Sequence, residues 1–292
     1  MRQRNRAGAQ GRHVCVLSRG LVPPAVPLHE RVERVLGDVR DPIRMLELVA
    51  GAEVVVLAMQ GFAGPGGVSP RTVDQEGSRN VMAAAEQADA DVVLLSIAGA
   101  SATSPLELAR VKYGVEEHLR TSRCRCTVVR SDAFAQTWFE VLEQTAGRSR
   151  RPVVFGAGTN PIGWVDVHEV AALVEHAVLE PSLRGRVLEI SGSERLTVEQ
   201  LASLLMKQHG WPGKPRRIPP SALRVIATPA APVRPDLARQ ARASLAIGHP
   251  PAGRRPRDQG RLPRPPCRTR QPVAHPDRLN PQGDRRRHRT SG

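Results

Sequence analysis

No apolar run in this 292-residue chain approaches the roughly 20 residues that a membrane-spanning helix needs. The longest run, residues 54–59, has the length of a β-strand. Arginines follow Met1, but no apolar signal-peptide segment follows them, which argues against secretion. The four cysteines lack the paired spacing of a metal site, and such sparse use is typical of a reduced, cytoplasmic protein. The composition therefore predicts neither a membrane partner nor a metal site.

Acidic residues are few beside the basic ones, 28 against 43, which gives a net charge of +15. The excess lies at the two ends of the chain. Residues 249–292 carry +9 and residues 1–12 carry +4, which leaves only +2 for residues 13–248. Because the body is nearly neutral, we do not expect it to bind nucleic acid.

The C-terminal tail, residues 249–292, contains twelve arginines and nine prolines but no Phe, Trp, Tyr, Ile or Met. Such a segment cannot bury enough apolar surface to offset its chain entropy, so we expect it to be disordered. It could bind a polyanion through arginine, although it has no aromatic residue for base stacking. Alternatively, the tail and the anomalous residues 1–12 reflect a frameshifted or mis-started reading frame, because 40 of the 43 basic residues are arginine.

Strand-like and helix-like segments alternate through the body. Strands are predicted at residues 14–19, 53–59, 92–96, 126–130, 153–155, 162–165 and 187–190, with a further short strand ending at residue 36. Helices are predicted at residues 42–50, 73–88, 105–120, 167–179 and 198–208. Asp41 is expected to cap the first helix, while Ser104 and Thr197 begin capping boxes at later helices. This alternation predicts a mainly parallel sheet with helices on both faces.

The first predicted strand comes too late for a complete dinucleotide-binding domain. In such a domain, a strand, a glycine-rich turn and a helix come earlier and hold the cofactor pyrophosphate. We therefore predict an α/β, Rossmann-like fold, a doubly wound parallel sheet that lacks the first strand and the glycine-rich turn. The lost central strand would leave two open edges in the sheet, or let its neighbours pair directly.

Four regions follow from these patterns. They are an anomalous basic N-terminus (residues 1–12), an incomplete dinucleotide-binding region (13–150), a smaller C-terminal substrate region (151–248) and the disordered tail (249–292).

Several short motifs carry a resemblance to a known family. They are Gly-Asp-Val-Arg-Asp at 37–41, the helix opening at 74–81, the strand end at 93–96, Lys112 before the strand at 128–130, and the segments 164–171 and 188–192. Their order and spacing resemble the atypical short-chain dehydrogenase/reductase superfamily, close to the NmrA-like NAD(P)-binding proteins. The resemblance covers about residues 13–245 and implies an NAD(P)-binding oxidoreductase.

The resemblance also implies cofactor contacts at the ends of three predicted strands. These contacts are Ser18 and Arg19 at the adenosine ribose, Asp38 and Val39 at the adenine edge, and Ala58, Met59 and Gln60 over the inner ribose. An arginine at position 19 suits a 2′-phosphate, which favours NADP over NAD. Arg19 as a plain surface residue and Asp38 as a plain turn residue are the alternatives. Asn80 is expected to support the sheet rather than bind the cofactor.

The catalytic positions depart from the family pattern. Tyrosine-dependent members carry Tyr-x-x-x-Lys, in which the lysine lowers the pKa of the phenol and the phenol passes a proton. Lys112 matches the lysine, but Leu108 stands at the tyrosine position, and the only tyrosine, Tyr113, lies about 100° around the helix. Ser96 matches the family serine, and because the tyrosine is missing its alternative is a plain hydroxyl at a strand end. Lys112 could still hold a ribose, or alternatively pair with Glu116 one turn away.

The sequence therefore predicts an NADPH-dependent reductase of the NmrA-like type that binds its cofactor weakly or not at all. Its small-molecule substrate is expected near Phe62, Trp138 and Phe139. The alternative interpretation is that these three aromatic side chains belong to the hydrophobic core. A non-catalytic nucleotide sensor or partner-binding protein is the main alternative, and polyanion binding through the tail is a weaker one.

Overall fold

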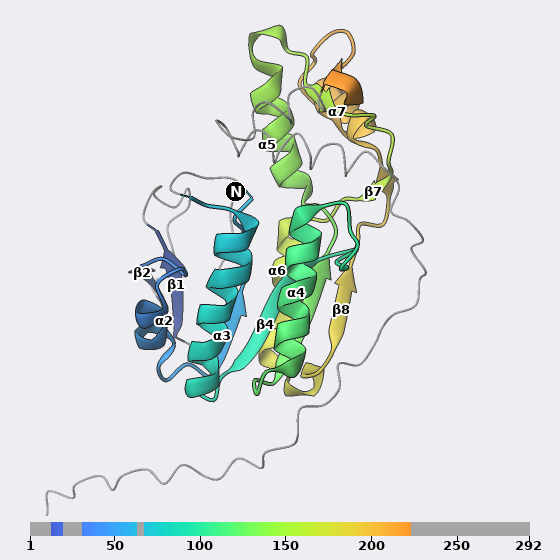
Figure 1. The fold of residues 1–292 in the computed structure, drawn as a ribbon. Coiled ribbons are helices and arrows are strands. Elements are labelled where there is room, and N and C mark those ends of the chain that lie inside the picture. Colours follow the sequence, from blue (N-terminus) through green and yellow to red (C-terminus); the bar gives the residue numbers. More distant parts are fainter. Residues whose placement is uncertain (1–12, 20–30, 63–66, 223–292) are drawn as a thin grey trace, which may run out of the picture.

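The computed structural model describes residues 13–19, 31–62 and 67–222 (Figure 1). The predictions for residues 1–12 and for the tail, 249–292, lie outside the described residues, as does the last part of the expected substrate region. None of the helices in the described segments is both long and apolar enough to cross a bilayer.

Six of the described strands form two separate parallel arrays. β1 (Val14–Ser18) pairs with β2 (Val32–Leu36). The main sheet has the order β3-β4-β5-β8 and contains the segments Val54–Leu57, Asp91–Ile97, Cys126–Ser131 and Val187–Ile190. Within the described residues, β1 and β3 do not pair with each other, and no strand occupies the position between them. Of the two alternatives for the lost strand, direct pairing of its neighbours is therefore wrong.

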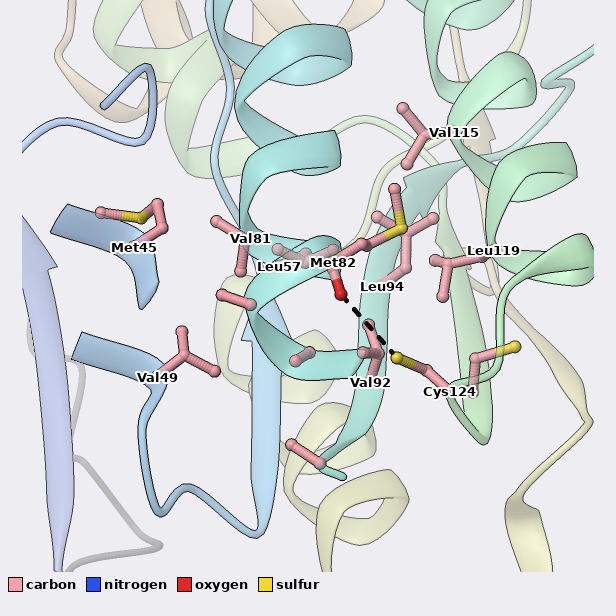
Figure 2. Packing of buried hydrophobic residues seen from close by; sticks show 14 of the residues in the cluster. Met45, Val49, Leu57, Val81, Met82, Val92, Leu94, Val115, Leu119 and Cys124 are labelled. Carbon is pink, nitrogen blue, oxygen red and sulfur yellow. Dashed lines mark hydrogen bonds between the residues drawn. The ribbon is translucent and has the colours of Figure 1, made fainter. Parts of the chain in front are cut away.

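Hydrophobic packing, rather than strand pairing, joins the β1–β2 pair to the main sheet. Helix α2 (Pro42–Val49) begins where the Asp41 carboxylate accepts the N–H groups of residues 43 and 44, as predicted. Its buried Met45 and Val49 share one core cluster with Leu57 of β3, and Leu17 of β1 packs against that cluster. Figure 2 shows Val49 reaching from α2 toward the core, with Met45 of the same helix in the same cluster.

Helices cover both faces of the main sheet, as the alternation predicted. α3 (Ser78–Gln87) and α4 (Glu107–Thr121) lie on one face, and α6 (Val167–Leu179) lies on the other (Figure 1). The β-branched strand centres are sealed between them, since Val92 and Val93 of β4 are completely buried. Met82 of α3 points into this core beside Leu94 (Figure 2).

The helix before α3 begins earlier than predicted and has an unusual geometry. Residues Pro70–Gly77 form a π-helix, η1, which continues directly into α3. Ser69 and Thr72 cap its first turn reciprocally, and Pro70 occupies the first helical position, where its missing N–H costs nothing. The start of the helix is therefore set by these cap residues. The spacing of apolar residues, on which the predicted start at residue 73 was based, does not set it.

The capping box predicted for α4 is wrong. The Ser104 hydroxyl accepts the N–H of Leu106 across 3.3 Å, within a turn, and the helix begins at Glu107 without a side-chain cap. The capping box of α7 (Val198–Gln208) is confirmed, because Thr197 and Gln200 make both reciprocal bonds. Helix α6 and strand β8 have the predicted bounds.

A smaller group of elements lies beyond the carboxyl ends of the main sheet (top of Figure 1). It contains α5 (Ala135–Ala146), α7, and the short strands β6 (Val153–Phe155), β7 (Ile162–Gly163), β9 (Arg195–Leu196) and β10 (Arg216–Ile218). Two single 3₁₀ turns, Gly147–Ser149 and Pro181–Leu183, connect helices to strands. A second core cluster, with Leu142, Val154 and Leu205, holds this group together. Since α6 and β8 return to the main sheet, the boundary expected at residue 150 stays a prediction.

Candidate cofactor site

The predicted adenosine residues lie together at the carboxyl ends of β1 and β2. Ser18 ends β1 and stands opposite Leu36, which ends β2. The N–H of Gly37 donates to the Ser18 carbonyl at 3.0 Å, so the two strand ends remain joined past the sheet. Arg19 follows directly and is exposed. The carboxyl edge of a parallel sheet is the usual ligand position in this architecture.

Asp38 carries a paired charge beside this edge. Arg40 donates from Nε to Asp38 Oδ1 at 3.0 Å and from Nη2 to Oδ2 at 2.6 Å. These hydrogen bonds, assisted by the charges of Arg40 and Arg19, hold the pKa of the Asp38 carboxyl below its ordinary value of 3.8. Arg40 was not predicted as a site residue, although its position two residues after Asp38 in a turn is a signal for such a pair.

Val39 is fixed from the α3 side. Asn80 donates from Nδ2 to the Val39 carbonyl at 2.9 Å, so its role is structural, but it supports the turn after β2 rather than the sheet. Gly77 allows this close approach, because a Cβ at that position would lie 2.5 Å from Val39 Cγ2. The loop after β2 is thereby pressed against the start of α3.

Lys112 lies beneath the loop after β3. Its ammonium donates to the Met59 carbonyl at 3.1 Å and lies 2.9 Å from Asp74 Oδ1, a charge contact without hydrogen-bond alignment. Lys112 is 3% exposed and Asp74 is fully buried. The structure thus brings together two predicted cofactor residues, Lys112 and Met59, while Ala58 and Gln60 beside Met59 are exposed. The ion pair predicted as an alternative, between Lys112 and Glu116, is wrong.

Glu116 instead belongs to a buried network with Ser96. The Ser96 hydroxyl donates to Glu116 Oε1 at 2.5 Å, and Arg130 donates to Glu116 Oε2 at 2.6 Å. The hydrogen bond to Glu116 raises the pKa of the Arg130 guanidinium, despite its partial burial. Leu108, at the tyrosine position, is apolar and buried. The Ser96 hydroxyl is therefore committed to a carboxylate, and no proton donor stands at position 108.

The predicted substrate aromatics fall in two places. Phe62 is half-buried on the loop after β3, next to Gly61. Trp138 and Phe139 of α5 pack partly buried on the second core, where the Trp138 ring meets the Trp164 ring edge-on at 5.7 Å. Trp138 and Phe139 therefore contribute to packing, and the substrate role of all three stays a prediction.

A further polar pair at the carboxyl edge escaped prediction. The Ser191 hydroxyl donates to Asp132 Oδ2 at 2.6 Å, which links the segments that follow β5 and β8. Two polar residues far apart in the sequence give no local signal for such a contact; only the strand order places them together.

One exposed group with metal-binding side chains lies on the β1–β2 pair. His13, Cys15 and Glu33 place one ligand atom each within 4.8 Å of one another. Burial and the charge of Glu33 raise the pKa of the Cys15 thiol, which disfavours the thiolate that a metal would need. This group lies at the start of β1, whereas Ser18 and Arg19 lie at its end.

Dinucleotide-binding α/β proteins are a class that binds its ligand at the carboxyl edge of a parallel sheet. In this chain, Ser18, Arg19 and Asp38 lie at such an edge. Within that class, the chain belongs to the NAD(P)H-binding family, whose sequence profile matches residues 6–180. The predicted NAD(P)-binding family is thereby confirmed, and the predicted Rossmann-like fold agrees with the solved structures described below.

One similar protein of known activity is the NAD(P)H azoreductase of Xenophilus azovorans, 22% identical over 183 residues. The match covers 62% of this chain and 60% of the azoreductase, so the chain spans less than two thirds of that relative.

Solved structures show the same fold. A nucleoside-diphosphate-sugar epimerase of Staphylococcus aureus superimposes with a TM-score of 0.65 at 19% identity, covering 84% of both chains. The NADPH-dependent quinone oxidoreductase of Escherichia coli, complexed with NADPH, gives 0.60 at 22% identity over 75% of this chain and 74% of its own. The triphenylmethane reductase of Citrobacter sp., complexed with NADP(H), gives 0.60 at 20% identity over 79% and 78%.

Proposed function

We propose that this protein is an NADPH-dependent reductase of a small conjugated acceptor, such as a quinone or an azo compound. The observation that carries the proposal is the carboxyl edge of an NAD(P)H-binding fold, where Arg19 and Asp38 stand at one end and Lys112 with Met59 at the other. Relatives that reduce azo compounds and quinones with the same cofactor class support the choice of substrate.

The chemistry does not require the tyrosine that Leu108 replaces. A bound nicotinamide would supply a hydride to a quinone or azo group, and the resulting anion could take its proton from water. No side chain at position 108 has to deliver that proton. Arg19 would contact the 2′-phosphate, which favours NADPH over NADH.

We further propose that the described residues hold the cofactor weakly. In the doubly wound order, the pyrophosphate turn follows the strand between β1 and β3, and no described residue occupies that position. The adenosine and ribose contacts would then act without the backbone N–H groups that normally bind the two phosphates.

The test is consumption of NADPH by the purified chain with a panel of quinones, azo dyes and aldehydes. We expect turnover with quinones or azo dyes and none with aldehydes, whose alkoxide products need a well-placed acid. Saturable NADPH binding without turnover of any acceptor would reject the reductase.

That outcome would favour the second candidate, a non-catalytic nucleotide sensor. The apolar Leu108 and the commitment of Ser96 to Glu116 are the observations in its favour. A small-molecule substrate and a cytoplasmic location belong to the reductase proposal. Polyanion binding would depend on a tail that lies outside the described residues.

The variant Ser96→Ala addresses the predicted catalytic role of this serine. Removal of its bond to the buried Glu116 should cost about 1–3 kcal/mol of unfolding free energy. Turnover per folded molecule should not change, because the hydroxyl is directed to the carboxylate. A large loss of kcat at unchanged stability would instead assign Ser96 to the reaction.

A further inference from the structure

Asp74 is a completely buried carboxylate to which the proposed reaction assigns no step. It projects from η1, the π-helical segment before α3, and π-helical turns are rare and often lie at functional sites. Its Oδ2 accepts the N–H of Gly61 at 2.7 Å, and its Oδ1 lies 2.9 Å from Lys112 Nζ. Lys112 in turn donates to the Met59 carbonyl. One ion pair thus holds two backbone groups of the loop after β3.

The loop is also fixed sterically against the start of η1. A Cβ at Gly61 would lie 2.4 Å from the Ser69 carbonyl oxygen and 2.7 Å from Val73 Cβ. Any larger residue at position 61 would push the loop away from Asp74. The hydrogen bond and the close approach therefore select the same loop position.

The buried ion pair between Lys112 and Asp74 is not explained by its contribution to stability alone. Apolar residues of similar volume often stabilise a fold equally well or better, because two charges lose their hydration on burial. The specific consequence of this pair is the position of the Met59 carbonyl and the Gly61 N–H. The ammonium of Lys112 donates to the Met59 carbonyl and is held beside Asp74 Oδ1 by charge, at 2.9 Å.

We infer that Asp74 is a positioning residue for the cofactor. Together with Lys112, it holds residues 59–61 in the ribose-binding position before the cofactor arrives, so that binding does not have to order this loop. The inference rests on the proposed function for its purpose, but the clamped loop itself is a property of the protein without ligand.

Amide hydrogen exchange of the full chain without cofactor tests the clamp directly. We expect slow exchange of the Gly61 amide in the natural protein and at least about ten-fold faster exchange of that amide in Asp74→Ala, which removes its acceptor. Asp74→Asn retains an amide oxygen that can accept from Gly61, so it should restore part of the protection. Asp91→Asn is the matched control, because Asp91 is another buried carboxylate with two arginine partners, Arg125 and Arg184.

If Asp74→Ala does not fold, Gly61→Ala leaves both charges in place and should expose the same loop. Titration with NADPH and NADH then links the clamp to binding. Loss of Asp74 should weaken both cofactors by the same factor, about five- to ten-fold, because the ribose is common to them.

Loop exchange that rises no more in the Asp74 variants than in Asp91→Asn, at matched stability, would overturn the inference. Unchanged cofactor affinity in a variant with a released loop would overturn it as well. A protected loop in a chain that binds neither cofactor would reject the proposed function but leave the clamp standing.

Discussion

Arg19 is the residue that should set the cofactor preference. It is exposed at the end of β1 and near enough to Asp38 to lower the pKa of that carboxyl. Arg19→Ala should weaken NADPH binding by about 1.5–3 kcal/mol, the range for a hydrogen bond to a charged group, and leave NADH unchanged. Parallel fluorescence titrations measure both. Arg120→Ala, an exposed arginine at the far end of α4, is the control. If Arg19→Ala lowers the affinity for NADPH and NADH equally, Arg19 does not contact the 2′-phosphate.

Asp38 gives a prediction about pH. Its native pKa lies below the ordinary 3.8, so its pairing stabilises the fold at pH values above 3.8 and is lost as the pH falls through the native pKa. Because the pair is partly exposed, we expect Asp38→Asn to cost only about 0.5–1 kcal/mol at neutral pH. Urea unfolding at several pH values should show this difference constant down to about pH 5 and shrinking below pH 4. A difference that grows in acid would contradict the assignment.

Sequence patterns located Lys112 but not its partner. The family pattern identified the lysine and implied a ribose contact for it, with an ion pair to Glu116 one helical turn away as the alternative. The structure pairs Lys112 with Asp74, which a separate helix supplies. Local spacing cannot show which charges become buried together, because that depends on how two helices meet.

At the scale of elements, the sequence predicted what local signals determine. Helix α6 begins and ends at the predicted residues. Its N-cap is Asp166, whose carboxylate accepts the N–H of His168. The predicted start of α4 was wrong, because the segment Ser-Pro-Leu-Glu at residues 104–107 also suits a turn before the helix. The short strands β9 and β10 carry no recognisable period and exist only through their partners β7 and β6.

Helix α2 is the element on which the attachment of the β1–β2 pair depends. Met45 is 1% exposed at this junction, and a two-stranded array alone is only marginally stable. Met45→Ala should cost about 2–5 kcal/mol. It should also raise hydrogen exchange in β1 and β2 more than in β4, because the pair can detach while the main sheet stays folded.

The matched variant is Leu142→Ala, which opens a cavity in the second core instead. It should destabilise the smaller group of elements and leave exchange in β1 and β2 unchanged. If both variants raise exchange uniformly across the chain, the two arrays unfold as one unit and the packing junction has no separate role.

At the scale of the whole molecule, the fold class followed from alternation alone, but the site could be predicted only in outline. The carboxyl edge gathers segments from β1, β2 and β3 because parallel strands end on one side. Family membership supplies the cofactor class, and the weak hold on the cofactor that we propose rests on the position between β1 and β3, where no described residue lies.

The most direct test is a titration of the purified chain with NADPH and then NADH, followed by nicotinamide fluorescence. We predict saturable binding that is weaker than micromolar and tighter for NADPH than for NADH. A micromolar dissociation constant would contradict the weak hold on the pyrophosphate. The absence of any saturable binding would contradict the cofactor site itself.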